Sequence, residues 1–164
     1  MKDTRKTRME LANRLFFRLY QCANMLHKTG TRAIEDEGLT TQQWAVLGAL
    51  SRPQVRGGMK LGDLARYLMV SRQNLAGVVG RLERDGRVAS HADPQDRRSR
   101  LITLTVAGGK VWQQQALPKI HAYYAQVLQD FSTNDTIHAI HYLLSMLNRM
   151  RQLDTPDGET DERV

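Results

Sequence analysis

The sequence predicts a mainly α-helical protein with one small β-hairpin. Apolar residues recur at helical spacing from Met9 to about Glu37, and this spacing returns after residue 106 and continues to about residue 147. Between these regions, after Gly86, apolar residues occupy every second position, which is typical of strands. A polar turn, Asp93–Ser99, interrupts the segment 88–104, so the sequence predicts a two-stranded hairpin there.

Capping and turn-forming residues divide the first half of the chain into shorter elements. Gly38 can take the left-handed conformation of a C-cap and is expected to end the first helix. In the next segment, GLTTQQWAVLGAL, Thr40 or Thr41 can cap a second helix, with Gln43 close behind. The segment SRPQVRGGM is predicted to be a loop, because it combines a proline, two adjacent glycines and charged residues.

The central segment, MKLGDLARYLMVSRQNLAGVVGRLERDGRV, has the order of a helix-turn-helix motif. A short amphipathic helix from Leu61 to Leu68 leads through a tight connection to Ser71, which can cap a second helix over residues 71–84. The apolar face of this second helix consists of Leu75, Val78, Val79 and Leu82. The hairpin follows directly, so the predicted order is helix, turn, helix, wing.

The last third of the chain is predicted to contain two more helices. Pro118 is expected to start a turn or to kink the first of them, because proline has no backbone N–H to donate. Ser132 or Thr133 can cap the last helix. The segment 153–164 is acidic and poor in apolar residues, and it is expected to be a disordered tail.

The composition is that of an ordinary globular protein with a basic balance. The 164 residues include 24 Lys and Arg against 17 Asp and Glu, a formal net charge of +7. Such a charge favours polyanions as partners, nucleic acid first and an anionic membrane second, although a merely soluble basic surface fits the charge equally well. The sequence contains no apolar run long enough for a transmembrane helix and no signal-peptide core, and its one cysteine, Cys22, suits a reducing compartment. A cytoplasmic location is therefore expected.

The residues exposed on the helix-turn-helix and hairpin are of the types that read DNA. Arginine can bridge the major-groove edge of guanine, and glutamine or asparagine that of adenine, although an ordinary polar first turn is the alternative. Arginines at a hairpin tip suit the minor groove, and short carboxylates in the turn can bond backbone amides or orient an arginine. The predicted DNA contacts are Ser71, Arg72, Gln73 and Asn74 in the first turn, Arg81 and Arg84 further along, and Arg97, Arg98 and Arg100 in the hairpin, with Asp93 and Asp96 shaping the turn.

In these motifs the chain resembles the MarR family of bacterial winged-helix transcriptional regulators. The resemblance covers roughly residues 10–150 and is sharpest over LGDLARYLMVSRQNLAGVVGRLERDGRV and over DPQDRRSRLITLTVAGG, which matches the family wing signature D-x-x-D-R-R-x-x-x-x-x-L-T-x-x-G. It implies a recognition helix at 71–84 and a wing at 88–104. The wing-tip arginine of the family maps onto Arg97 or Arg98, and its structuring aspartate onto Asp93 or Asp96.

The resemblance also implies a homodimer whose terminal helices interlock, with one winged lobe on each subunit. On this basis residues 1–38 and 106–152 would form a helical dimerisation region, and residues 39–105 a winged helix-turn-helix DNA-binding lobe. The wide apolar faces of the terminal helices also favour a dimer over an intramolecular bundle. A two-fold dimer would place its recognition helices about 34 Å apart, one turn of DNA, which predicts a pseudo-palindromic operator.

Family members commonly release DNA when they bind a small molecule or when a cysteine is oxidised. In the segment LFFRLY, Phe16 occupies the position of the family's reactive thiol, and Cys22 lies six residues later. Of the five histidines only His138 and His141 share a helical face, with no further ligand at metal-binding spacing. These observations disfavour peroxide sensing by the family's route and metal sensing. A redox- or metal-responsive regulator of the same fold is kept as the alternative.

An organic effector is favoured. The segment YLMVSRQNLAGVVGRLE is similar to regulators of aromatic-acid breakdown, and aromatic walls with an arginine would suit an aromatic carboxylate or its coenzyme A thioester. For each aromatic residue taken singly, packing in the core is the simpler explanation. The elements that line the family's pocket contribute six candidate residues, which are Arg18, Tyr20, His27, Arg32, Trp44 and Trp112.

An enzyme and a module that binds a protein or a membrane are the two other classes of function. The sequence shows no catalytic triad, glycine-rich phosphate loop, paired carboxylates or metal cage, so neither an enzyme nor a cofactor is expected. A basic helical module that binds a protein or an anionic membrane is the third class. The function predicted is a ligand-responsive repressor that binds its operator as a homodimer.

Overall fold

The computed structural model describes residues 2–154, except for the side chains of residues 2–4, Arg97 and Arg98, and the predicted acidic tail beyond Asp154 lies outside the described residues. The chain divides into two compact units, Met1–Tyr124 and Ala125–Val164, which are described separately. The elements of the first unit are α1 (Lys2–Ala33), η1 (Glu35–Glu37), α2 (Thr41–Leu50), η2 (Pro53–Val55), β1 (Met59–Lys60), α3 (Leu61–Leu68), α4 (Arg72–Arg84), β2 (Val88–Asp93), β3 (Asp96–Leu104), α5 (Val106–Lys110), the π-helical segment η3 (Val111–Ala116) and most of α6 (Leu117–Val127). The second unit contains the end of α6 and α7 (Thr133–Asp154).

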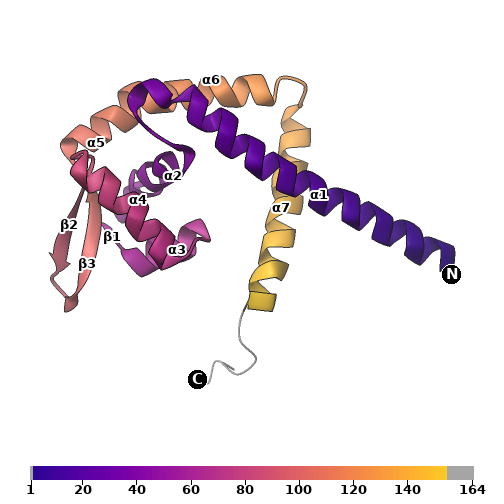
Figure 1. The fold of residues 1–164 in the computed structure, drawn as a ribbon, viewed down its shortest axis with the longest axis horizontal. Coiled ribbons are helices and arrows are strands. Elements are labelled where there is room, and N and C mark those ends of the chain that lie inside the picture. The colour runs from indigo at the N-terminus through magenta and orange to yellow at the C-terminus, as the bar shows by residue number, and fades with distance from the viewer. Residues whose placement is uncertain (1, 155–164) are drawn as a thin grey trace. The chain divides into compact units, whose positions relative to one another are not determined.

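The mainly helical fold with a hairpin wing is confirmed, and so is the helix-turn-helix. The Thr40 side chain caps α2 in a capping box with Gln43. In the turn after α3, Met69 takes a left-handed conformation with φ 56°, and the Val70 amide donates to the Ala65 carbonyl at 3.1 Å. This closes the helix within two residues, so that α4 starts at Arg72 and the two helices of the motif can pack against each other (Figure 1).

The apolar core lies under this motif. The four residues predicted for the buried face of α4 are all buried, together with Leu47 of α2, Leu64 of α3 and Ile102 of β3. Burial of each such side chain contributes about 1.5–3 kcal/mol to stability. Because α4 is fixed on its inner side by this core, its opposite face is left exposed.

The sheet has three strands, where the sequence predicted two. The additional strand, β1, pairs antiparallel with β3 through Met59 and Lys60, and the strand order is β1-β3-β2. Residue 59 belongs to the segment predicted to be a loop. A two-residue strand directly after two glycines is too short to show a periodicity in the sequence. The turn of the hairpin is also shorter than predicted: β3 already begins at Asp96, since polar residues can continue a strand that is exposed on one face.

Helix ends differ from the predictions in two places, and in a third the structure selects one of two predicted caps. α1 begins at Lys2 and ends at Ala33, and Gly38, with φ 61°, closes the short η1 segment instead. Pro118 does not break its helix: it follows the π-helical segment η3, whose widened turn fits a residue that has no N–H to donate. Ser132 rather than Thr133 caps α7, since its Oγ accepts from the Asp135 amide at 3.1 Å.

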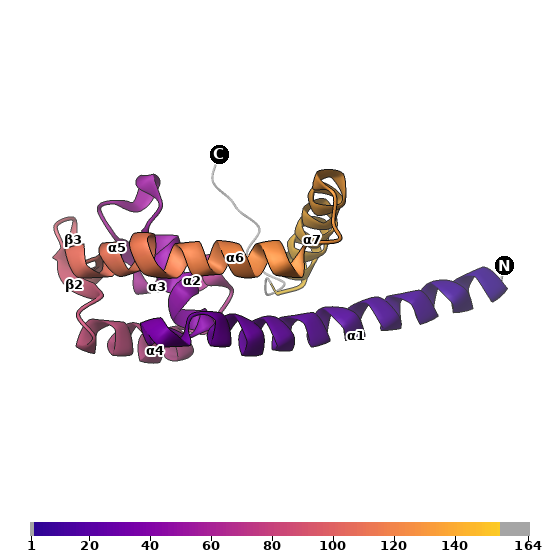
Figure 2. The same cartoon turned by 90° about the horizontal axis from the view of Figure 1, so that it is seen from above.

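The long α1 helix is the least packed part of the first unit. Its N-terminal half runs away from the lobe formed by α2 to β3, as Figures 1 and 2 both show. It carries a series of large apolar side chains that are about half exposed or more, which are Met9, Leu11, Leu15, Phe16, Phe17, Tyr20, Met25 and Leu26. Soluble proteins rarely leave so many large apolar side chains exposed on one helix without a partner.

Candidate nucleic-acid interface

The first turn of α4 is fixed by its cap. The Ser71 hydroxyl accepts a hydrogen bond from the Asn74 amide at 3.2 Å, so one of the four unpaired amides at the helix start is satisfied by this side chain. The outward face of α4 follows from the helical repeat and lies opposite the buried Leu75 and Leu82. Its centre carries Gln73 and Arg84, with the glycines at 77 and 80 between them, where an added Cβ would meet no atom within 4 Å.

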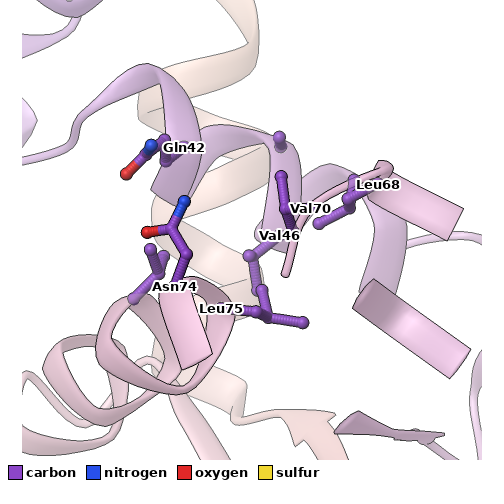
Figure 3. A pocket seen from close by; sticks show the side chains of 8 residues that line it. Gln42, Val46, Leu68, Val70, Asn74 and Leu75 are labelled. Carbon is purple, nitrogen blue, oxygen red and sulfur yellow. The ribbon is translucent and has the colours of Figure 1, made fainter. Parts of the chain in front are cut away.

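The predicted base-reading residues of this turn do not share one direction. Residues two apart on a helix point about 200° apart. Arg72 lies on the side of α3 and the wing, and its guanidinium covers Gly62. Asn74 lies on the opposite side, where it and Gln42 of α2 edge a small apolar hollow of about 90 Å³ (Figure 3). Gln73, exposed between them, points straight outward.

A basic groove joins α3, the first turn of α4 and β3. It has a volume of about 650 Å³ and is lined by Lys60, Leu61, Gly62, Asp63, Arg66, Arg72, Ser99 and Arg100. Four of these eight residues are cationic and only one is acidic, and that one, Asp63, is paired with Arg66. A groove of this charge between a recognition helix and a hairpin suits a phosphate backbone.

The hairpin is tied to the rest of the lobe by a lysine. Lys60 Nζ lies 3.0 Å from an Asp93 carboxylate oxygen and 3.6 Å from one of Asp96. The other Asp93 oxygen accepts from the Gln95 amide at 2.9 Å, inside the turn. These aspartates are expected from the sequence to bond backbone amides or to orient an arginine. The pairing with Lys60 could not be predicted, since a partner 33 positions away leaves no local signal.

Of the three hairpin arginines, Arg100 has a described side chain. Arg100 donates to the Ser90 carbonyl across the hairpin at 2.7 Å and is exposed at the edge of the basic groove. The backbone of Arg97 and Arg98 belongs to β3, and their side chains lie outside the described residues. On α4, both Arg81 and Arg84 are exposed in the last turns of the helix.

The ion pair between Lys60 and Asp93 gives the wing a defined pH dependence. The Gln95 amide, and next the Lys60 ammonium, hold the pKa of Asp93 below its ordinary value of 3.8. The hydrogen bond to Asp93 raises the pKa of Lys60 above 10.5. A lowered carboxylate pKa stabilises the fold above pH 3.8, and this contribution is lost as the pH falls through the pKa of folded Asp93.

We therefore expect Asp93→Asn to lower the thermal unfolding midpoint at pH 7, with a difference from the wild type that shrinks towards zero below pH 3.8. Calorimetry between about pH 2.5 and about pH 7 measures this difference. Asp130→Asn, at an exposed aspartate, is the matched control and should show little difference at any pH. A deficit for Asp93→Asn that stays constant across the whole range would contradict the assignment.

A second cluster links the end of α4 to η1 and α6. Arg87 Nη2 donates to the Glu37 carbonyl at 2.6 Å, and Lys119 Nζ lies 2.7 Å from the Glu37 carboxylate and 3.1 Å from that of Asp36. The Arg87 carbonyl is so close to Gly108 that a Cβ there would lie 1.8 Å from its oxygen. The backbone just after the recognition helix is thus held by packing against α5.

The six residues predicted to bind an effector are placed in two different settings. Trp44 and Trp112 are buried in the core, Trp44 edge-on to Tyr123 and Tyr124 and Trp112 against Gly48. The four residues on α1, which are Arg18, Tyr20, His27 and Arg32, are exposed. Arg18 and Arg32 are fourteen positions apart, about 21 Å along a helix, so the carboxylate of an aromatic acid can pair with only one of them in the same chain.

Redox sensing would need a reactive cysteine, and metal sensing would need a cluster of ligands. Cys22 is exposed on α1. No group of three or more potential metal ligands occurs among the described residues. Within residues 2–154 no helix is both long and apolar enough to cross a membrane.

The order of these elements and the exposed arginines beside a basic groove define the class of protein: a winged helix-turn-helix protein that binds DNA. A sequence model of the MarR family matches residues 37–99. The transcriptional activatory protein BadR of Rhodopseudomonas palustris is 69% identical over 155 residues, which cover 94% of this chain and 87% of BadR. The homoprotocatechuate degradative operon repressor of Escherichia coli is 30% identical over 75% of this chain and 82% of its own length. The chain belongs to the MarR family and is a DNA-binding transcriptional regulator.

Solved structures agree with this fold. The transcriptional regulator MOSR of M. tuberculosis in complex with DNA is 25% identical, with a TM-score of 0.67 over 82% of this chain and 96% of that one. The organohalide-sensing regulator RdhR in its 2,4-dichlorophenol-bound form gives a TM-score of 0.77 over 90% of this chain and 85% of that one, at 21% identity. At that identity the second likeness is one of fold alone.

Proposed function

We propose that the protein is a repressor that binds a pseudo-palindromic operator as a homodimer and is released from it by an aromatic acid or its coenzyme A thioester. The observation that carries the DNA-binding part is the exposure of Arg72 and Gln73 on a capped first turn, beside a basic groove and a wing. Both side chains have the donors that base edges accept in the major groove. The wing arginines, Arg97 or Arg98, would enter the adjacent minor groove.

The apolar surface of α1 supports the dimer. Eight large apolar side chains between Met9 and Leu26 are 45–67% exposed. A second copy of the chain is the partner that closes such a surface symmetrically, and residues 1–38 and 106–152 would then form the dimerisation region around the DNA-binding lobes at 39–105. Sedimentation velocity should give twice the 18.7 kDa chain mass. Phe16→Glu together with Phe17→Glu should give monomers that bind the operator much more weakly.

The aromatic effector is supported by the relatives and by the chemistry of the candidate pocket. The regulator that is 30% identical controls a degradative operon for homoprotocatechuate, an aromatic acid. Trp44, Tyr123 and Tyr124 form an aromatic cluster, and the Tyr123 hydroxyl meets the Thr29 hydroxyl of α1 at 2.8 Å. Tyr20 or His27 would flank an aromatic ring near this cluster, and Arg18 or Arg32 would bind a carboxylate.

The two relatives are named with opposite signs of regulation. One is an activatory protein and the other a repressor. When an effector releases a repressor from DNA, transcription rises, as it does when an effector switches on an activator. Both names therefore fit an increase in transcription in the presence of the effector. In cells that lack the gene, we expect the controlled promoter to be permanently active, whereas an activator would leave it silent.

The effector is tested by release from DNA. The protein is bound to a fluorescent duplex from upstream of its own gene, and benzoate-type acids and their coenzyme A thioesters are added one at a time. We expect at least one of them to lower the affinity about tenfold or more, which corresponds to about 1.4 kcal/mol of coupling. If no acid or thioester acts while peroxide or a transition metal does, the redox or metal alternative replaces this proposal.

A further inference from the structure

Gly62 lies in the basic groove at the second position of α3, where the sequence gives no reason for a glycine. Glycine inside a helix is about 1 kcal/mol less favourable than alanine. The reason lies in the neighbouring helix: a Cβ at residue 62 would be 2.7 Å from Arg72 Nη2 and 3.1 Å from its Cζ and Nε. The guanidinium of Arg72 thus occupies the space that a side chain at residue 62 would fill.

The arginine that rests on Gly62 keeps its donors available. Among the described residues, no hydrogen bond or ion pair within the chain engages the Arg72 guanidinium. The nearest carboxylate in the groove, that of Asp63, is paired with Arg66 instead. The Arg72 guanidinium therefore packs over Gly62 without a polar partner among the described residues, and its five N–H groups are available to a ligand.

We propose that Gly62 is a specificity-determining residue, because the lack of a side chain there sets the position from which Arg72 reaches the DNA. This rests on the proposed reading of a base by Arg72. With its guanidinium over Gly62, Arg72 lies on the side of α4 that faces α3 and the wing. Any side chain at residue 62 would lift it towards the outward face, where Gln73 lies. The residue at position 62 would thus decide which base pair or phosphate Arg72 contacts.

The chain provides a test that separates this role from helix stability. Gly62→Ala should keep or raise the unfolding midpoint, because only the mobile end of an arginine must move and alanine favours the helix. Gly109→Ala is the matched control, since Gly109 is also helical and an added Cβ there meets nothing within 4 Å. Gly62→Ala should change DNA specificity, whereas Gly109→Ala should not.

Specificity is measured on a duplex that the wild-type protein selects from a random pool, and on copies of it with single base-pair changes. We expect Gly62→Ala to alter the preference at one base-pair position in each half-site by about 5-fold or more. The same substitution in an Arg72→Ala background should have no further effect, because the displaced group is then absent.

Two results would overturn the inference while leaving the proposed function intact. The preference could be unchanged in Gly62→Ala, or it could change equally with and without Arg72. If the wild-type protein selects no sequence at all, the proposed function and this inference fail together.

Discussion

Arg72→Ala is expected to relax base preference at one position of each operator half-site and to lower the affinity by about 1–3 kcal/mol, or roughly 5- to 150-fold. The reason is that Arg72 lies exposed in the first turn of α4, with its guanidinium unengaged by the described residues of its own chain. Fluorescence anisotropy with operator duplexes that differ by single base pairs measures both effects.

The arginines that are expected to bind DNA without reading a base in the major groove provide the comparison. Arg84→Ala, in the last turn of α4, and Arg97→Ala or Arg98→Ala, in the wing, should weaken binding to all duplexes to a similar extent. Each should also reduce the slope of log affinity against log salt by about one. Equal effects of Arg72→Ala and the wing substitutions on the same single base position would contradict this division of roles.

Gly108→Ala is expected to destabilise the protein by about 3 kcal/mol or more, since overpacking against the backbone leaves few ways to relax. The new Cβ would lie 1.8 Å from the carbonyl oxygen of Arg87 and 2.7 Å from its carbonyl carbon. Because Arg87 lies just beyond α4 and anchors it to η1, the shift should also weaken operator binding. Urea unfolding followed by circular dichroism measures the loss.

The neighbouring glycine controls for the change in helix propensity. Gly109→Ala places its Cβ in open space and should leave the urea midpoint unchanged or slightly raised. For a chain of this size, 3 kcal/mol corresponds to roughly 6–12 °C in the thermal midpoint. Similar midpoints for the two variants would show that α5 does not pack against Arg87 as described.

The elements that could be predicted from sequence are those with a local signal. The serine cap at position 71 and the four apolar positions behind it define α4 within the chain itself, and the change of apolar spacing after Gly86 defines the hairpin. The wing signature added the family. Apolar spacing on α1 also pointed to a surface that needs a partner, and these side chains are exposed in the single chain.

What escaped prediction depends on contacts between distant positions. β1 is too short for periodicity and exists because Met59 and Lys60 pair with Ile102 and Leu101. Lys60 forms an ion pair with Asp93, 33 positions away, and the lack of a side chain at Gly62 leaves room for the Arg72 guanidinium of the next helix. Likewise, the four consecutive residues 71–74 look equivalent in the sequence, although the helix turns Arg72 and Asn74 to opposite sides.

That the first turn of α4 reads a particular DNA sequence, with the wing adding affinity for any duplex, is tested most directly by a salt titration. Affinity is measured for a duplex from upstream of the gene and for a scrambled duplex between about 50 and 200 mM salt. We expect both affinities to fall steeply, by about 10³- to 10⁵-fold if six to ten phosphates are contacted, with the upstream duplex remaining at least roughly 10³-fold tighter. Equal binding of the two duplexes throughout the titration would contradict the claim.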